Sequence, residues 1–326
     1  MIESKHSKFL LLAAAVCSTT AVFAASVAGY PTRPIRLVVP FAPGGSGDAI
    51  ARIITPKLTE AMGQQWVVDN RGGAAGNIAA ETVARAAPDG HTVFLGLSTV
   101  VTANPALYKL SFSMEKDLQA VTMLTISQYI LVLNPSVRAD SVKELIALAK
   151  QRPRSLNYSS GGVGSPLHLA AELFQKRAGI EMVHIPYKGG GASAAAVVVG
   201  ETQFGVSSIA SSMQLVKAGR LKAIATTGLQ RSQVAPDLPT LVESGFPGLE
   251  VSSWYGLLVP SGTSTSIVQR IRNEAIKTVQ APEVHQALAR QGLQVVTSTP
   301  QELAARIRSD TKTWAEVIKS AGIKAE

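Results

Sequence analysis

A short aliphatic strand, a glycine-rich loop and an amphipathic helix follow one another near the start of the chain. Residues 35–39 are apolar except for one arginine, as expected of a buried strand. After a loop at residues 40–47, the apolar side chains of residues 48–62 fall on one helical stripe, which Gly63 ends. Because this order of strand and helix recurs along the chain, the sequence predicts an α/β fold with mostly parallel sheets.

The alternation continues to the end of the chain. Ser141 and Glu144 have the spacing of a capping box, and Ser165 with Pro166 suits the start of another helix. Pro56 lies inside the first helix and should kink or divide it. Further strands are predicted at residues 66–68, 129–133, 182–185, 202–206, 221–226 and 255–259, with one more ending near 158, and further helices at 265–280, 283–291 and 300–321.

Length and composition indicate a globular protein with more than one core. The chain has 326 residues, of which 46% are hydrophobic and 16% are charged. Such a composition excludes an intrinsically disordered protein. Single cores rarely grow past about 250 to 300 residues, so two domains or lobes are expected.

The first residues are typical of a secretory signal peptide. Two lysines precede an apolar run at residues 9–16, and small residues suitable for cleavage follow. We predict a signal peptide of residues 1–24, with cleavage as late as residue 28 left open. Either cut removes Cys17, the single cysteine, and the bulky Val16 before it disfavours a lipid anchor there. The mature protein is therefore expected to be periplasmic and cysteine-free, without a membrane span.

Charge and motifs argue against several classes of function. The net charge of +9 comes from scattered basic residues, which argues against nucleic-acid binding but favours encounters with anionic solutes. The sequence contains no Gly-x-Ser-x-Gly and no Gly-Lys-Ser or Gly-Lys-Thr. Its histidines beyond the signal are dispersed, so no catalytic residue, metal or cofactor is predicted. These histidines are His91, His168, His184 and His285.

One segment has part of a dinucleotide-binding fingerprint. Gly45 and Gly47 follow a strand and open a helix, and Asp69 stands at the end of the next strand. However, Ile50 occupies the position of the third glycine. The alternative function is therefore an exported nucleotide-dependent oxidoreductase that uses the Gly45 to Asp69 unit. A further alternative is an interaction protein that binds no small ligand.

Two glycine-rich loops, at residues 42–48 and 160–165, each join a strand to the start of a helix. Main-chain N–H groups and the positive end of the helix dipole make such places suitable for anions. Two loops converging on one carboxylate would reach micromolar affinity, about 8 kcal/mol, without an arginine. The alternative is that the glycines only make turns and that Ser165 only caps its own helix.

A series of short motifs runs along essentially the whole mature chain. They are Tyr30-Pro31, residues 34–41, Pro43-Gly44-Gly45 with Asp48, Asn70-Arg71, Gly76-Asn77-Ile78, Pro88-Asp89-Gly90, residues 104–108, Gly164-Ser165 with His168-Leu169-Ala170, His184-Ile185-Pro186-Tyr187, Pro239-Thr240, Trp254 and residues 321–324. In this order they resemble the Bug-type solute-binding proteins of tripartite tricarboxylate transporters.

The resemblance implies a two-lobed, type II-like periplasmic binding protein fold, with a ligand cleft between lobes joined by two crossing strands. Lobe 1 is expected at residues 30–124 plus 253–326, and lobe 2 at residues 125–252. The resemblance also implies a monomeric, non-enzymatic receptor for a small organic anion such as a dicarboxylate. Its expected partners are membrane transporter subunits or a sensor protein. Nucleic acid is not expected to be a partner.

In that family, backbone amides and bridging waters from the two glycine-rich loops hold the ligand. Transferred by position, the predicted ligand-binding residues are Phe41, Ala42, Pro43, Gly44, Gly45, Ser46, Asp48, Ser98, Gly162, Gly164, Ser165 and Ser207. Asp48 would orient water or a ligand ammonium group, or would only be a helix first-turn charge. Phe41 would line the first wall or only pack in the core.

The chain departs from the family pattern in two places. Ala192, Ser193 and Ala196 replace a common Pro-Ala and Asp, which puts details of a helix in lobe 2 in doubt. Ser207 and Ser208 stand where an Asp or Asn is common, so a partner for a cationic group is missing. This second change favours a plain carboxylate over an amino acid.

Overall fold

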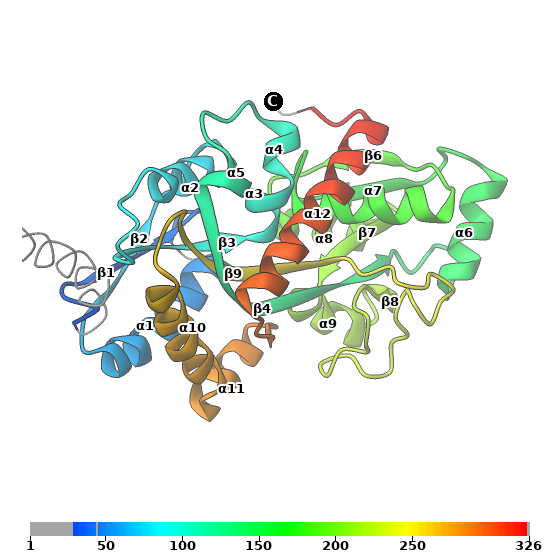
Figure 1. The fold of residues 1–326 in the computed structure, drawn as a ribbon. Helices are drawn as coiled ribbons and strands as arrows, with labels where there is room; N and C mark the ends of the chain where they lie inside the picture. The colour runs from blue at the N-terminus through cyan, green and yellow to red at the C-terminus, as the bar shows by residue number, and fades with distance from the viewer. Residues whose placement is uncertain (1–28, 44, 325–326) are drawn as a thin grey trace, which may run out of the picture.

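The computed structural model describes residues 29–43 and 45–324. The predicted signal peptide with Cys17, and the predicted site residue Gly44, lie outside the described residues. Two α/β halves lie side by side, and the C-terminal helix runs across both of them (Figure 1). None of the helices within the described residues has the length and apolar composition needed to span a bilayer.

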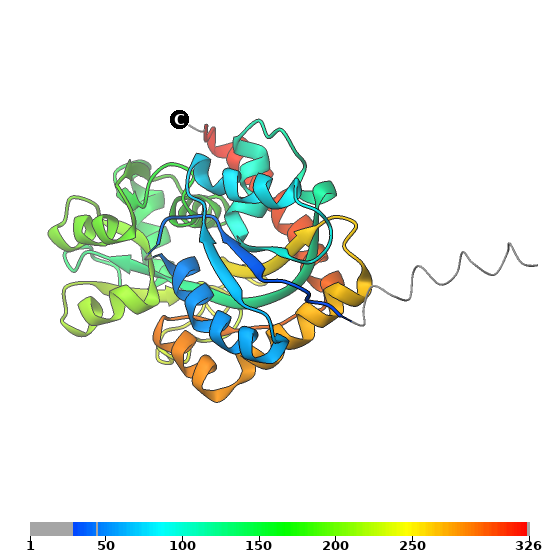
Figure 2. The same cartoon turned by 90° about the vertical axis from the view of Figure 1, so that its left-hand side faces the viewer.

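The first half is built on three parallel strands, in which β1 lies between β2 and β3. Helices α1 and α10 (Thr265–Gln280) pack together on one face of this sheet, and α2 packs on the other (Figure 2). Its elements before the crossing strands are β1 (Ile35–Val39), α1 (Ser46–Met62), β2 (Trp66–Asn70), the 3-10 turn η1 (Ala74–Gly76), α2 (Asn77–Ala84), β3 (Thr92–Leu97), α3 (Ser98–Thr102), α4 (Asn104–Leu107) and α5 (Met114–Asp117).

The second half repeats the plan with β5 between β6 and β7, again in parallel. Strand β8 pairs antiparallel with β4 (Leu118–Leu133), on the side of β4 opposite β7. The elements of this half are α6 (Val142–Gln151), β5 (Asn157–Ser160), α7 (Pro166–Ala178), β6 (Val183–Pro186), α8 (Gly190–Val199), β7 (Phe204–Ser208), α9 (Ile209–Lys217) and β8 (Lys222–Thr226).

Two long strands connect the halves. Strand β4 (Leu118–Leu133) pairs with β9 (Ser252–Pro260) along its first part and with β7 along its last five residues. Strand β9 continues into the first sheet by pairing with β3. The chain therefore enters the second half along β4 and returns along β9, and then completes the first half with α10 (Thr265–Gln280), α11 (Pro282–Arg290), β10 (Gln294–Val295) and α12 (Pro300–Ala321).

Each half has a hydrophobic core of its own. In β4, Tyr129, Leu131 and Leu133 contribute to one core, and Ile130 and Val132 to a smaller one on the opposite face. This alternation is the one expected of a strand covered on both sides. Helix α12 contributes to the cores of both halves, with Leu303 and Ile307 in the first and Trp314, Val317 and Ile318 in the second.

Local rules set several element ends. Gly63 ends α1 in the left-handed conformation with φ 68°, and the Ser165 side chain caps α7 ahead of Pro166 as predicted. At the capping box of α6, Ser141 accepts the N–H of Glu144, but the Glu144 carboxylate accepts the N–H of Asp140 rather than that of Ser141. Helix α1 is continuous through Pro56, so the proline does not divide the helix, and the alternative expectation of a kinked axis stays a prediction.

Candidate functional site

Two pairs of parallel strands, β1 with β3 and β5 with β7, have their carboxyl ends near the middle of the crossing strands. Leu97, the last residue of β3, pairs with Tyr255 of β9. From the other half, Ser208, the last residue of β7, pairs with Tyr129 of β4. Strands β1 and β5 run parallel to β3 and β7, so the two glycine-rich loops that follow them lie at these same edges. In an open α/β sheet, this edge is where ligands bind.

A helix begins at each of these four strand ends. Helices α3 and α9 start directly after β3 and β7, and α1 and α7 start after the two glycine-rich loops. Helix N-termini carry unsatisfied N–H groups and partial positive charge. Gly45 and Leu97, the N-cap residues of α1 and α3, make no side-chain cap, whereas Ser165 caps α7. The arrangement therefore favours an anion, chiefly at the uncapped ends.

The first glycine-rich loop is held by contacts with distant strands. Asn70 on β2 donates its side-chain amide to the carbonyl of Phe41 over 3.1 Å. The Tyr255 hydroxyl is hydrogen-bonded to the Ser46 side chain and to the Gly47 backbone. Burial raises the pKa of Tyr255, although these two hydrogen bonds act in the opposite direction. A Cβ atom at Gly47 would lie 3.2 Å from Val39 and 3.3 Å from Tyr255, so only glycine fits there easily.

Most of the predicted residues of this loop are exposed. Residues Phe41, Ala42, Pro43, Gly45 and Ser46 are all exposed, with Phe41 at 36%. Phe41 is therefore not a core residue, and its aromatic ring is accessible at the loop. The ligand-binding role of these residues stays a prediction.

Asp48 is a buried residue in the first turn of α1, only 6% exposed. Both of its carboxylate oxygens accept hydrogen bonds from Nε of Arg52, at 3.0 Å each. The carboxylate therefore has a cationic partner one helical turn away, and it also complements the positive end of α1.

The serines predicted at the strand ends are buried. Ser98 begins α3, and its hydroxyl accepts the main-chain N–H of Trp254 at 3.4 Å. Ser207 on β7 shares a 2.6 Å hydrogen bond with Ser212 of α9. Both hydroxyls therefore have protein partners in this structure. The Ser98 hydroxyl links the start of α3 to β9, and the Ser207 hydroxyl links β7 to α9.

The second glycine-rich loop faces the first half. Gly162 and Gly164 have φ angles of 118° and 72°, which glycine adopts without strain. A Cβ atom at Gly164 would lie 3.2 Å from Leu107 of α4. A pocket of about 420 Å³ opens between this loop and α4, and the ammonium-bearing residues Lys188 and Lys324 also line it.

The loop amides already have hydrogen-bond partners. The Gly164 N–H donates to Nδ1 of His168 over 3.0 Å, and the Gly162 N–H donates to Oγ of Ser160 over 3.2 Å. The Ser160 hydroxyl is in turn 2.6 Å from Nε2 of His184. Sequence reasoning missed this role for the two histidines, because the pairing joins residues from three different elements.

The histidine pair makes stability depend on pH. Burial lowers the pKa of His168 from 6.5 to about 3, with a further contribution from His184, and burial lowers the pKa of His184 to about 4. Unfolded imidazoles take up protons near pH 6.5 but these rings do not, so their stabilisation is complete above that pH and is lost as the pH falls toward 4. Burial raises the pKa of Glu172 beside them, which has the opposite effect on stability.

We therefore expect the free energy of unfolding to fall by about 1 to 2 kcal/mol between pH 7 and pH 5. Urea unfolding at the two pH values measures this difference. The variant His168→Asn should show a smaller difference than the parent. Equal differences in parent and variant would mean that His168 does not cause the effect.

The alternative dinucleotide interpretation finds no support in the geometry. The Asp69 carboxylate, which would have to bind a ribose, is paired with both Arg36 and Arg71. Within residues 29–43 and 45–324, no cluster of three or more His, Cys, Asp or Glu side chains is arranged to hold a metal ion.

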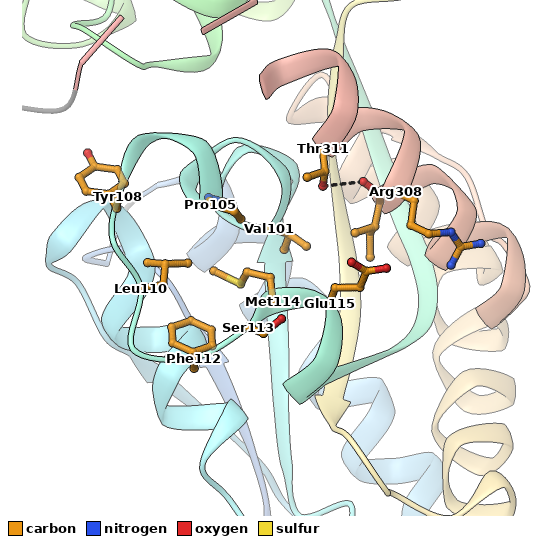
Figure 3. A pocket seen from close by; sticks show the side chains of 11 residues that line it. Val101, Pro105, Tyr108, Leu110, Phe112, Ser113, Met114, Glu115, Arg308 and Thr311 are labelled. Carbon is orange, nitrogen blue, oxygen red and sulfur yellow. Dashed lines mark hydrogen bonds between the residues drawn. The ribbon is translucent and has the colours of Figure 1, made fainter. Parts of the chain in front are cut away.

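A second pocket lies away from the glycine-rich loops. A cavity of about 320 Å³ lies between α12 and the segment from α3 to α5. Figure 3 shows that apolar side chains such as Leu110, Phe112 and Met114 line it together with the charged Glu115 and Arg308. None of the residues predicted to bind ligand lines it, but Tyr108 lines both this cavity and the pocket at the second glycine-rich loop.

Comparison with known proteins agrees with this geometry. A family model described as "Tripartite tricarboxylate transporter family receptor" matches residues 50–323. Protein BugT of Bordetella pertussis is 34% identical over 319 residues, which are 97% of this chain and 98% of BugT. The solved structure of R. palustris Rpa4515 with adipate is 33% identical, with a TM-score of 0.75, covering 90% of this chain and 99% of that one. The solved structure of MatC from Rhodopseudomonas palustris with bound malate is 30% identical, with a TM-score of 0.72, covering 89% of this chain and 100% of that one.

Proposed function

The chain belongs to the receptor family of the tripartite tricarboxylate transporters, and from this premise we propose that it is a periplasmic receptor for a small organic carboxylate. The observation that supports the proposal is that four helices begin at the carboxyl ends of strands near the crossing strands, and that α1 and α3 begin without a side-chain cap. Adipate and malate are the molecules bound in two structural relatives, which makes a dicarboxylate the first class to test.

In the proposed complex, the carboxylate lies between the loop of residues 42–48 and the second loop, with Phe41 and Val163 beside its aliphatic part. Both of these side chains are exposed apolar groups, at 36% and 39%. Three predicted site residues already have protein partners, and we propose that they hold the site in shape rather than contact the ligand directly. These residues are Ser98, Ser207 and Asp48. The N–H groups at the start of α1 replace the hydration of the carboxylate, as burial of a charge requires.

Binding is proposed to close two lobes, residues 30–124 plus 253–326 and residues 125–252, about the segments that join them. Those segments are β4, β9 and α12, which contributes side chains to the cores of both halves. We propose a monomer that carries out no reaction and presents its closed form to transporter subunits or to a sensor protein in the membrane. Hinge closure around a ligand is the established behaviour of proteins with such lobes.

Calorimetry and thermal unfolding with a defined panel test the proposal. The panel contains adipate, malate, glutamate and NAD. Adipate or malate at ~100 times its dissociation constant should stabilise the protein by about 2.7 kcal/mol. At the same concentration, NAD and glutamate, a dicarboxylate with an added ammonium group, should have smaller effects. Binding of NAD in preference to every acid would instead support the oxidoreductase alternative. A chain that binds none of the four would contradict a receptor for dicarboxylates of this size.

A further inference from the structure

Three rings from separate elements pack together next to the second glycine-rich loop. The rings of His168 on α7 and His184 on β6 are 3.9 Å apart between centroids and inclined by 9°. The ring of Tyr158 on β5 lies 4.8 Å from that of His184 at 19° and 6.3 Å from that of His168 at 21°, so it packs beside the histidine pair. His168 is only 4% exposed, so its ring has a fixed position in the core of the second half.

Both histidines present a ring nitrogen to the loop. Nδ1 of His168 accepts the N–H of Gly164, and Nε2 of His184 lies within hydrogen-bond distance of the Ser160 hydroxyl. That hydroxyl bonds both the N–H and the carbonyl of Gly162, at 3.2 Å and 3.1 Å. The two glycines with left-handed φ angles are therefore each tied to one ring, directly or through Ser160.

The bond to Gly164 requires a particular tautomer of His168. An N–H donor needs an unprotonated Nδ1, so the proton of the neutral ring is on Nε2, which lies 3.9 Å from a Glu172 carboxylate oxygen. Glu172 also accepts a hydrogen bond from the Tyr158 hydroxyl. A proton added to Nδ1 would oppose the Gly164 N–H. The burial that lowers the pKa of His168 keeps the ring in the accepting form.

We propose that His168 is a positioning residue for ligand binding: its Nδ1 acceptor fixes Gly164 and so preorganises the second loop before the carboxylate arrives. This inference rests on the proposed function, because the loop is assigned there to the closing side of the site. Glycines in a loop have a wide conformational freedom, and ligand binding must order them unless the protein has already done so. The Gly164 amide itself thus acts inside the protein rather than on the ligand.

Two substitutions separate the acceptor from the imidazole. Asparagine at position 168 carries its amide oxygen the same number of bonds from the backbone as Nδ1, so His168→Asn keeps an acceptor for Gly164. His168→Leu fills similar space without an acceptor. Both variants lose the ring stack with His184 and should show similarly lowered unfolding midpoints, which are measured by circular dichroism as the control for folding.

The first measurement needs no ligand. Amide hydrogen exchange at Gly164, followed by NMR in the full mature chain, should be at least about tenfold faster in His168→Leu and close to the parent in His168→Asn, because the hydrogen bond protects the amide. Equal exchange in the two variants would overturn the inference.

The second measurement is calorimetry with adipate, and with malate if adipate fails to bind the parent. His168→Leu should bind about tenfold more weakly than the parent, and His168→Asn within about threefold. Equal affinities in both variants would overturn the positioning role. If the parent binds neither acid, the proposed ligand class is wrong, but the exchange experiment still decides whether His168 fixes the loop.

Discussion

Replacement of Trp254 by alanine should lower the free energy of unfolding by about 3 to 5 kcal/mol. Trp254 lies on the crossing strand β9 and is fully buried, with none of its surface exposed. Its removal leaves a cavity at the segment that joins the two halves. The indole N–H also donates to Oδ2 of Asp310 on α12 over 2.8 Å, so alanine removes a partner of a partly buried carboxylate.

The carboxylate belongs to a small charged network. Arg306 donates from Nε to Asp310 over 2.8 Å and from a terminal nitrogen to Glu250 over 2.9 Å. Burial raises the pKa of Asp310, although Arg306 and the Trp254 indole act in the opposite direction. The network joins α12 to the residues that lead into β9, and Trp254 is its contact with the strand itself.

Trp254→Phe is the matched control, because phenylalanine fills most of the space but cannot donate to Asp310. We expect this variant to lose less than half as much stability as Trp254→Ala. Urea unfolding followed by circular dichroism measures both. A loss below about 1 kcal/mol for alanine would show that the surroundings collapse around the site, contrary to the packing argument.

Local rules allowed much of the fold to be predicted from the sequence. Helices α10 and α12 have the predicted bounds, residues 265–280 and 300–321. In each of them the apolar periodicity and a polar N-cap residue, Ser264 or Thr299, agree with the long-range packing. The Ser165 cap was predicted on the same basis and is confirmed.

Strand β4 shows where sequence reasoning stopped. The prediction covered residues 129–133, but the strand begins at Leu118. Polar residues interrupt the apolar pattern in between, and Thr122 is one of them. It is nonetheless fully buried, because its hydroxyl bonds the carbonyl of Ser298, far away in the chain. Such a partner cannot be identified from the local pattern.

The candidate site divides in the same way. The two loops were predicted from glycine, strand and helix order, which are local features. Their supports, Tyr255 for the first loop and His168 with His184 for the second, come from other elements and required the structure. Aromatic and imidazole side chains in the core do not by themselves indicate which backbone group they will bond.

Ser46→Pro should weaken dicarboxylate binding by about 10- to 100-fold if the N–H groups of α1 hold the ligand. Ser46 is the first residue of the helix, and proline is well tolerated there because its fixed φ suits a helical start. The preceding Gly45 has ψ 173°, the extended conformation that a residue before proline prefers. The substitution thus removes one main-chain donor with little disturbance of the helix. A hydrogen bond to a charged group contributes about 1.5 to 3 kcal/mol, which sets the expected range.

Ser46→Ala is the control, because it removes the hydroxyl bonded to Tyr255 but keeps the main-chain N–H. Calorimetry with adipate or malate should give the alanine variant an affinity within a few-fold of the parent, well above that of the proline variant. If both variants bind equally well, the main-chain N–H of Ser46 does not donate a hydrogen bond to the carboxylate. If both lose binding equally, the Ser46 hydroxyl and its bond to Tyr255 are the important contact. Only a large difference between proline and alanine supports main-chain recognition, because these two variants differ at this position in the presence of the amide hydrogen and in the proline ring.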